Sequence, residues 1–207
     1  MIYEYHMANG HDGLYCRKGR KLQVKIFIDQ GHNPQNPNAG AEANGLREQD
    51  INYEVGIELA FLLGSDPQFE VMLSRNSPTE QLGTSNATSL AERVNAANRW
   101  GADYFISLHC NASINTEASG SEVYVYNRST PAYPLGEYIL AGLNAATGLP
   151  NRGMFINPEL YVLRKTTMPA LLVEMGYLTN TTDAELLSQY PQLFALGIYE
   201  GMAAYFS

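Results

Sequence analysis

Hydrophobic and polar positions along this chain follow two alternating periods. Val24, Ile26 and Ile28 occupy every second position, which predicts a strand that ends at the polar stretch 29–32. From residue 50 onward, apolar residues recur every three or four positions, which predicts an amphipathic helix that stops near Gly64. A strand followed by a helix is the repeating unit of α/β proteins.

The same succession recurs through the rest of the chain. The pattern predicts strands at 69–73, 104–108, 123–125, 161–163 and 170–173, and helices at 90–100, 135–146, 184–188 and 193–205. The runs at 104–108 and 170–173 are almost wholly apolar, as expected for strands that are covered on both faces. We therefore predict an α/β fold with three layers, in which a mainly parallel, twisted sheet lies between helices on both faces.

Chain length and composition indicate a single globular domain. The chain has 207 residues, of which 45% are hydrophobic and 16% charged. This length favours one domain over two, and this composition argues against intrinsic disorder. Because residues 1–21 show no sustained period, we expect an N-terminal extension there, with an extra strand or hairpin in it, followed by one domain at 22–207.

Net charge, apolar stretches and cysteine content exclude several classes of protein. The net charge of −8 would repel phosphate backbones, so nucleic acid is not an expected partner. The longest apolar stretches, such as 55–63, fall short of the roughly 18 residues that a membrane span needs, and the first thirty residues show no secretory signal. Two cysteines, Cys16 and Cys110, exclude a disulfide framework, and we expect both to be free thiols.

Polar residues stand where three predicted strands end. His32 follows the first strand, His109 ends the strand at 104–108, and Glu174 ends the strand at 170–173. Ligand sites of open α/β sheets gather at the carboxyl ends of the strands, so these side chains can converge. Glu48, in the first turn of the first predicted helix, could join them. Two imidazoles with one carboxylate are a ligand set of catalytic zinc, and a second carboxylate could then transfer protons.

Each of these residues also has a structural interpretation. A single histidine after a strand is more often a hydrogen-bonded loop residue, and Glu48 matches the preference of acidic side chains for helix N-termini. Glu174 is harder to explain in this way, because it stands between Val173 and Met175 and an unpaired carboxylate is costly to bury. The spacing alone leaves both interpretations open.

Five ordered segments make the zinc interpretation more specific. They are IDQGH at 28–32, GLREQDIN at 45–52, AERVNAAN at 91–98, SLHCNA at 107–112 and LVEMGYLTN at 172–180. In this order the chain resembles the zinc-dependent N-acetylmuramoyl-L-alanine amidases of the type 3 family, over roughly residues 22 to 206. The resemblance implies a single α/β domain, a zinc ion held by His32, Glu48 and His109, and Glu174 as the catalytic carboxylate.

The resemblance also implies a reaction and a location. The expected reaction is hydrolysis of the amide bond between the lactyl group of N-acetylmuramic acid and L-alanine of the peptidoglycan stem peptide, by zinc-activated water. This substrate lies outside the cytoplasmic membrane, so an extracytoplasmic, cell-wall location is expected. Asn111 and Arg93 are further motif positions, with a substrate contact or a supporting role for Asn111 and a substrate contact or a structural ion pair for Arg93.

The sequence departs from the family pattern in the loop that carries His32. Gln30 and Asn33 replace the proline and the second glycine of the usual Asp-Pro-Gly-His-Gly loop, which changes the stiffness of the turn. The stretch 110–161 is too short for the helical plug of regulated members of the family.

Two alternative functions remain open at this point. The first is a zinc carboxypeptidase or endopeptidase that acts on peptidoglycan, and the second is an inactive or partner-activated peptidoglycan-binding homologue. The sequence also leaves open an activator or anchoring protein as a partner, and the oligomeric state.

Overall fold

The computed structural model describes residues 23–207, so the expected extension at 1–21 and Cys16 lie outside the described residues. In chain order the elements are β1 (Val24–Gln30), β2 (Glu42–Ala43), β3 (Leu46–Arg47), α1 (Glu48–Ser65), β4 (Phe69–Leu73), α2 (Asn86–Trp100), β5 (Tyr104–Asn111), β6 (Ser121–Val125), α3 (Ala132–Thr147), β7 (Asn151–Ile156), α4 (Tyr161–Lys165), β8 (Ala170–Tyr177), α5 (Thr181–Gln189) and α6 (Pro191–Phe206).

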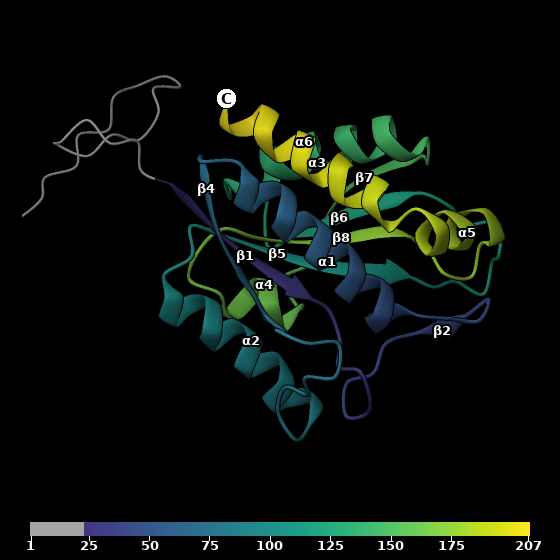
Figure 1. The fold of residues 1–207 in the computed structure, drawn as a ribbon, viewed down its shortest axis with the longest axis horizontal. Coiled ribbons are helices and arrows are strands. Elements are labelled where there is room, and N and C mark those ends of the chain that lie inside the picture. Colours follow the sequence, from purple (N-terminus) through teal and green to yellow (C-terminus); the bar gives the residue numbers. More distant parts are fainter. Residues whose placement is uncertain (1–22) are drawn as a thin grey trace, which may run out of the picture.

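One six-stranded sheet forms the middle layer, with the strand order β4-β1-β5-β8-β6-β7. The first four strands in this order are parallel, whereas β6 runs antiparallel to β8 and parallel to β7. Helices α1, α3 and α6 cover one face of the sheet, and α2 and α4 cover the other (Figure 1). The expected α/β fold with three layers and a mainly parallel sheet is confirmed.

Strand β1 shows how the hydrophobic pattern builds the two cores. Ile26 and Ile28 pack into the core beneath α1, α3 and α6, whereas Phe27 points to the opposite face and stacks on Phe105 of β5. The side chains of Ile26, Phe27 and Ile28 are all fully buried, because helices cover both faces of this strand. The face that carries Phe27 is called the α2/α4 face below.

Two local predictions were wrong or incomplete. Residues 161–163 form the start of helix α4 instead of a strand. A three-residue apolar run fits either element, and the consecutive side chains of Val162 and Leu163 both pack on the α2/α4 face, which a helical turn permits and strand alternation does not. Strand β7 was not predicted, because its edge position leaves most of its residues exposed and Gly153, at φ 98°, interrupts the pattern.

The strands bring the candidate residues to one end of the sheet. Both β5 and β8 run beyond their predicted ends, so His109 and Glu174 lie inside strands, and they are direct partners in the parallel register. A small hairpin, β2–β3, leads straight into α1, whose first residue is Glu48. Helix α3, the helix within 110–161, packs on the face opposite to the α2/α4 face and does not plug this end.

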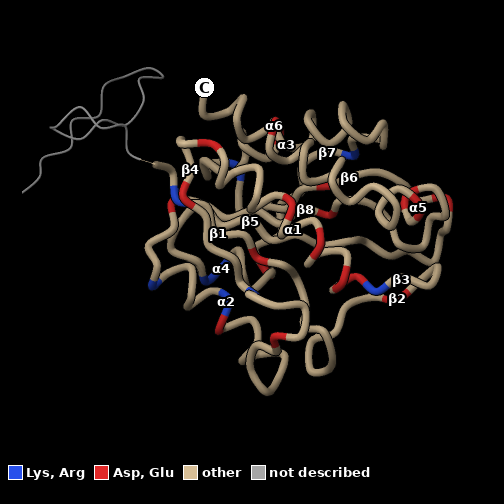
Figure 2. The backbone as a smooth tube through the Cα atoms, in the orientation of Figure 1, with Lys and Arg blue, Asp and Glu red and all other residues tan. Residues whose placement is uncertain are grey.

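Charged residues are interspersed over the described part of the chain, where Lys and Arg do not gather into a basic stripe (Figure 2). Within residues 23–207, no helix combines the length and the apolar character that a membrane crossing requires. Cys110 is a buried free thiol, as predicted.

Candidate metal centre and active site

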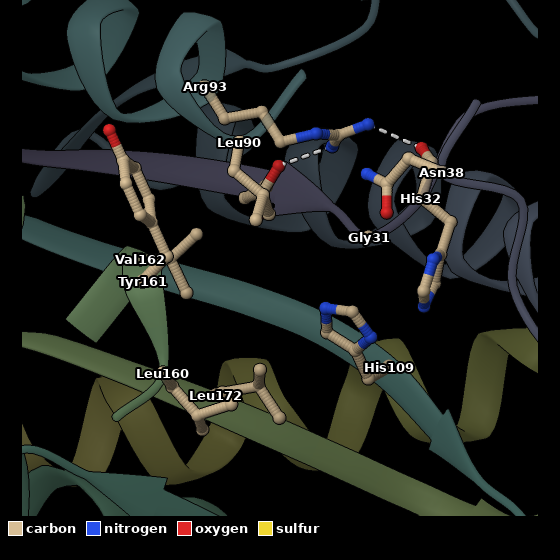
Figure 3. Close-up of a pocket in the computed structure, with 11 residues that line it drawn as sticks. Gly31, His32, Asn38, Leu90, Arg93, His109, Leu160, Tyr161, Val162 and Leu172 are labelled. Atoms are coloured by element: carbon tan, nitrogen blue, oxygen red, sulfur yellow. Dashed lines mark hydrogen bonds and ion pairs between the residues drawn. The ribbon is translucent and has the colours of Figure 1, made fainter. Parts of the chain in front are cut away.

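His32, Glu48 and His109 converge on one point at the carboxyl end of β1 and β5. Glu48 Oε1 lies 3.1 Å from His32 Nε2 and 2.9 Å from His109 Nδ1, and one ligand atom of each residue lies within 4.8 Å of the others. The two imidazole rings meet edge to face with centroids 4.8 Å apart (Figure 3). Ligand atoms around a tetrahedral zinc ion are about 3.3 Å apart, so this donor set fits such an ion.

Close backbone packing sets the positions of these ligands. Gly31 donates its N–H to the carbonyl of Leu108 at 3.0 Å, and a Cβ at Gly31 would lie only 2.5 Å from the His109 ring. A Cβ at Gly40 would likewise lie 2.7 Å from Glu48 Oε2. Both positions therefore require glycine, because any side chain there would displace a ligand.

Glu48 is held by the backbone as well as by the histidines. Its Oε2 accepts the Ala41 N–H at 2.9 Å and its Oε1 accepts the Cys110 N–H at 3.2 Å. Burial by itself raises the pKa of this carboxyl, but the hydrogen bonds and charge of His109 and His32 outweigh burial and hold the pKa well below its usual range. Glu48 is therefore an anion at neutral pH, as a metal ligand must be.

Glu174 lies beside the three ligands on the next strand, β8. Its side chain is partly exposed, and its Oε2 finds no hydrogen-bond partner among residues 23–207. Burial of the carboxyl, together with the negative charges of Glu48 and Glu122, raises the pKa of Glu174 to about 8. A carboxyl with this pKa can both take up and release a proton near neutral pH.

Arg93 of α2 holds the loop that carries His32. Its buried guanidinium donates to Asp29 Oδ1 at 2.6 Å, to the Gln30 carbonyl at 2.7 Å and also to the His32 carbonyl. Desolvation raises the pKa of the Asp29 carboxyl, but the charge and hydrogen bond of Arg93, with smaller contributions from Ser107 and His109, together outweigh it. The pKa of Asp29 therefore lies below its ordinary value. These contacts give Arg93 a structural role, and a substrate contact for it stays a prediction.

Gln30 and Asn33 compensate for the residues that they replace. Both side chains are fully buried. Gln30 Oε1 accepts the Arg75 N–H at 2.9 Å, and the Asn33 side chain exchanges two hydrogen bonds with the backbone of Leu82, at 2.9 and 3.1 Å. The loop therefore keeps a fixed conformation through side-chain hydrogen bonds where the family pattern would use proline and glycine.

Glu122 of β6 is a site residue that sequence reasoning missed. It is buried and accepts hydrogen bonds from Tyr177 at 2.5 Å, Arg152 at 2.6 Å and Tyr124 at 2.8 Å, while Asn111 donates to it at 3.3 Å. Burial raises the pKa of this carboxyl, and the donors together lower it below its ordinary value. The signal in the sequence was an acidic residue inside the apolar strand pattern at 121–125.

The side chain of Asn111 donates its hydrogen bond to Glu122 rather than to His32, Glu48 or His109. Asn111 is therefore connected to the site through the Glu122 carboxylate.

A cavity of about 130 Å³ opens beside the two imidazoles on the α2/α4 face (Figure 3). His32, His109 and Arg93 lie along its polar side, and its apolar side consists of Leu90, Leu160, Tyr161, Val162 and Leu172. The site therefore combines three residues that could hold a metal ion, a carboxyl that can exchange protons and an adjacent cavity.

Comparison with known proteins agrees with this arrangement. Residues 26–204 match the model of a family described as N-acetylmuramoyl-L-alanine amidase. The amidase CwlM of Bacillus licheniformis is 38% identical over 188 residues, which are 89% of this chain and 69% of that protein. The sporulation-specific amidase of Bacillus subtilis strain 168 is 35% identical over the same shares of the two chains.

A solved structure gives the same result. The N-acetylmuramoyl-L-alanine amidase of Clostridium difficile 630 superimposes with a TM-score of 0.79 and 28% sequence identity, covering 88% of this chain and 96% of that one. Because the family model spans nearly all of the described residues and these relatives carry the same name, this chain belongs to the family of N-acetylmuramoyl-L-alanine amidases, which are hydrolases of peptidoglycan.

Proposed function

We propose that this amidase holds a catalytic zinc ion with His32, Glu48 and His109 and uses Glu174 as its general base and acid. The observation that supports this most directly is the register of β5 and β8, which sets Glu174 beside His109. Three protein ligands of the His-Glu-His type leave a fourth position for water or substrate, as in other catalytic zinc sites.

The chemistry divides between the metal and the protein. A bound zinc ion supplies a Lewis acid that polarises a carbonyl and lowers the pKa of water to about 7. The Glu174 carboxylate accepts a proton from the attacking water as the new carbon–oxygen bond forms at the lactyl carbonyl. The resulting carboxylic acid then donates this proton to the L-alanine nitrogen as the carbon–nitrogen bond breaks. The products are a lactyl carboxylate on the glycan and a free stem peptide.

The substrate sets where the enzyme works and what it meets. Peptidoglycan lies outside the cytoplasmic membrane, so we infer extracytoplasmic action at the cell wall, in line with the relatives that are named as cell wall amidases. An activator or anchoring protein stays a prediction, as does the division of the chain into an extension at 1–21 and a catalytic domain at 22–207.

The bond that is cut distinguishes this proposal from its alternatives. We expect purified peptidoglycan incubated with the protein to gain new L-alanine amino termini, because the bond between the lactyl group and L-alanine is the one hydrolysed. Dinitrophenylation of the digest, followed by hydrolysis and chromatography, identifies the new termini. Release of D-alanine, or of amino termini inside the stem, would instead indicate a carboxypeptidase or an endopeptidase.

The same assay also tests whether the protein is an inactive homologue. A parallel sample treated with a chelator and then restored with zinc should lose and regain the L-alanine termini. If no termini of any kind appear in the zinc-supplied sample, the protein alone is inactive, and the interpretation as a partner-activated or binding homologue replaces ours.

A further inference from the structure

The sheet carries two neighbouring rows of side chains on its α2/α4 face. The first row, the catalytic row, consists of His109, Glu174 and Glu122, which are direct partners across β5, β8 and β6. The second, the aromatic row, consists of Leu172, Tyr124 and Phe155, which are direct partners across β8, β6 and β7. Residues two apart on a strand point to the same face, so the two rows lie next to each other on one surface.

Two rings of the aromatic row stack on each other, so only the outer face of each ring can meet a ligand. Tyr124 and Phe155 stack with centroids 5.3 Å apart and ring planes 25° apart. The Tyr124 hydroxyl donates to Glu122 at 2.8 Å, which fixes this ring from the side of the catalytic row. Phe155 keeps 39% of its surface exposed although it stacks on Tyr124. A partly exposed ring that is held in place is typical of a binding surface.

Helix α3 does not cover this surface. Helix α3 packs on the opposite face of β6 and β7, where a Cβ at Gly136 would meet Met154 and Val123. On the α2/α4 face, Leu172 links the aromatic row to the cavity, because it also lines that cavity. The aromatic row therefore begins at the edge of the cavity beside His32 and His109.

The side chains of the aromatic row favour one class of ligand. The Phe155 ring offers a flat apolar outer face, and the CH-lined faces of pyranose rings stack on such faces. Stem peptides carry carboxylates, and Arg152, the cation of β7, is already paired with Glu122 at 2.6 Å. The row is therefore suited to the glycan part of peptidoglycan rather than to its peptide part.

We propose that Phe155, supported by the Tyr124 ring on which it stacks, forms a carbohydrate subsite, on which a sugar ring of the glycan strand stacks while the scissile amide lies at Glu174. This inference rests on the proposed function, because it names the part of the same substrate that the open surface beside Glu174 binds. Phe155 is the residue to test, because its ring stacks on Tyr124 and it is not a member of the catalytic row.

The test measures binding without hydrolysis. The probe is purified glycan strands from which the stem peptides have been removed, so that no scissile amide is present, and calorimetry gives the dissociation constant. We expect Phe155→Ala to weaken binding about five- to tenfold and Phe155→Trp to retain it. Phe61→Ala is the matched control, because Phe61 is a 70% exposed ring on α1, and it should bind as the parent chain does.

Kinetics on intact peptidoglycan give the second measurement. Phe155→Ala should raise KM, with a larger share of the loss in KM than in kcat. Unchanged glycan binding by Phe155→Ala would overturn the subsite. So would a variant that loses binding only to free stem peptide, or one that differs from the parent chain only in self-association. Stem-free glycan contains no scissile amide, so weaker glycan binding by Phe155→Ala supports the subsite even if the protein shows no amidase activity. If the protein is an active amidase but Phe155→Ala binds glycan as the parent chain does, the subsite is refuted and the proposed function stands.

Discussion

Glu174→Gln is expected to lower kcat for the release of L-alanine termini by about 10²- to 10⁴-fold, which is the usual contribution of a general acid–base group. The amide that replaces the carboxyl cannot take a proton from water or return it to the leaving nitrogen. The fold should tolerate the change, because Gln has nearly the same shape and Glu174 Oε2 has no hydrogen-bond partner within 23–207 that would be lost. Initial rates on purified peptidoglycan, measured at saturating substrate, give the comparison.

Two controls separate a catalytic loss from other causes. The variant should keep the zinc content and the thermal unfolding midpoint of the parent chain, because Glu174 is not among the three converging ligands. Glu185→Gln makes the same chemical change at an exposed position of α5 and should leave kcat unchanged. Full activity of Glu174→Gln with zinc bound would show that another group transfers the proton.

His109→Ala is expected to lose both zinc and activity. Removing one of three protein ligands leaves the ion with Glu48 and His32 only, which is too few for a stable catalytic site. We expect less than about one tenth of the parent zinc content after dialysis, and a rate at the background of the assay, because the proposed nucleophile is water activated by zinc. Metal analysis and the amidase assay on the same preparation measure both effects.

Thermal unfolding shows whether the effect passes through the metal. Zinc that binds only the folded state raises the unfolding midpoint of the parent chain, whereas His109→Ala should show a much smaller rise on addition of zinc. Glu48→Gln offers a second variant, which keeps the shape of the side chain but removes the charge, and it should also bind zinc weakly. A His109→Ala protein with full zinc content would place the ion elsewhere.

Several features of this site follow directly from the sequence. The apolar runs at 104–108 and 170–173 predict buried strands, and polar residues at their ends predict a shared site, because parallel strands bring their carboxyl ends together. Glu48 is the first residue of α1, within one turn of where the hydrophobic period begins. For these residues the local pattern and the chain direction were sufficient.

Other features depend on contacts that no local pattern shows. The role of Glu122 arises from donors at positions 111, 124, 152 and 177, which only the sheet order brings together. The antiparallel direction of β6 sets Glu122 opposite Glu174, and alternation within β6 contains no information about that direction. Helix α4 was mistaken for a strand because a short apolar run fits both elements.

Anomalous X-ray scattering at the zinc edge, from crystals of the parent chain, tests the central claim most directly. We predict one strong peak about 2.0 to 2.2 Å from a nitrogen of His32, a nitrogen of His109 and an oxygen of Glu48, with Glu174 beside the ion but outside bonding distance. A zinc-loaded crystal with no peak among these three residues, or with the peak at other residues, would contradict the assignment of the metal centre.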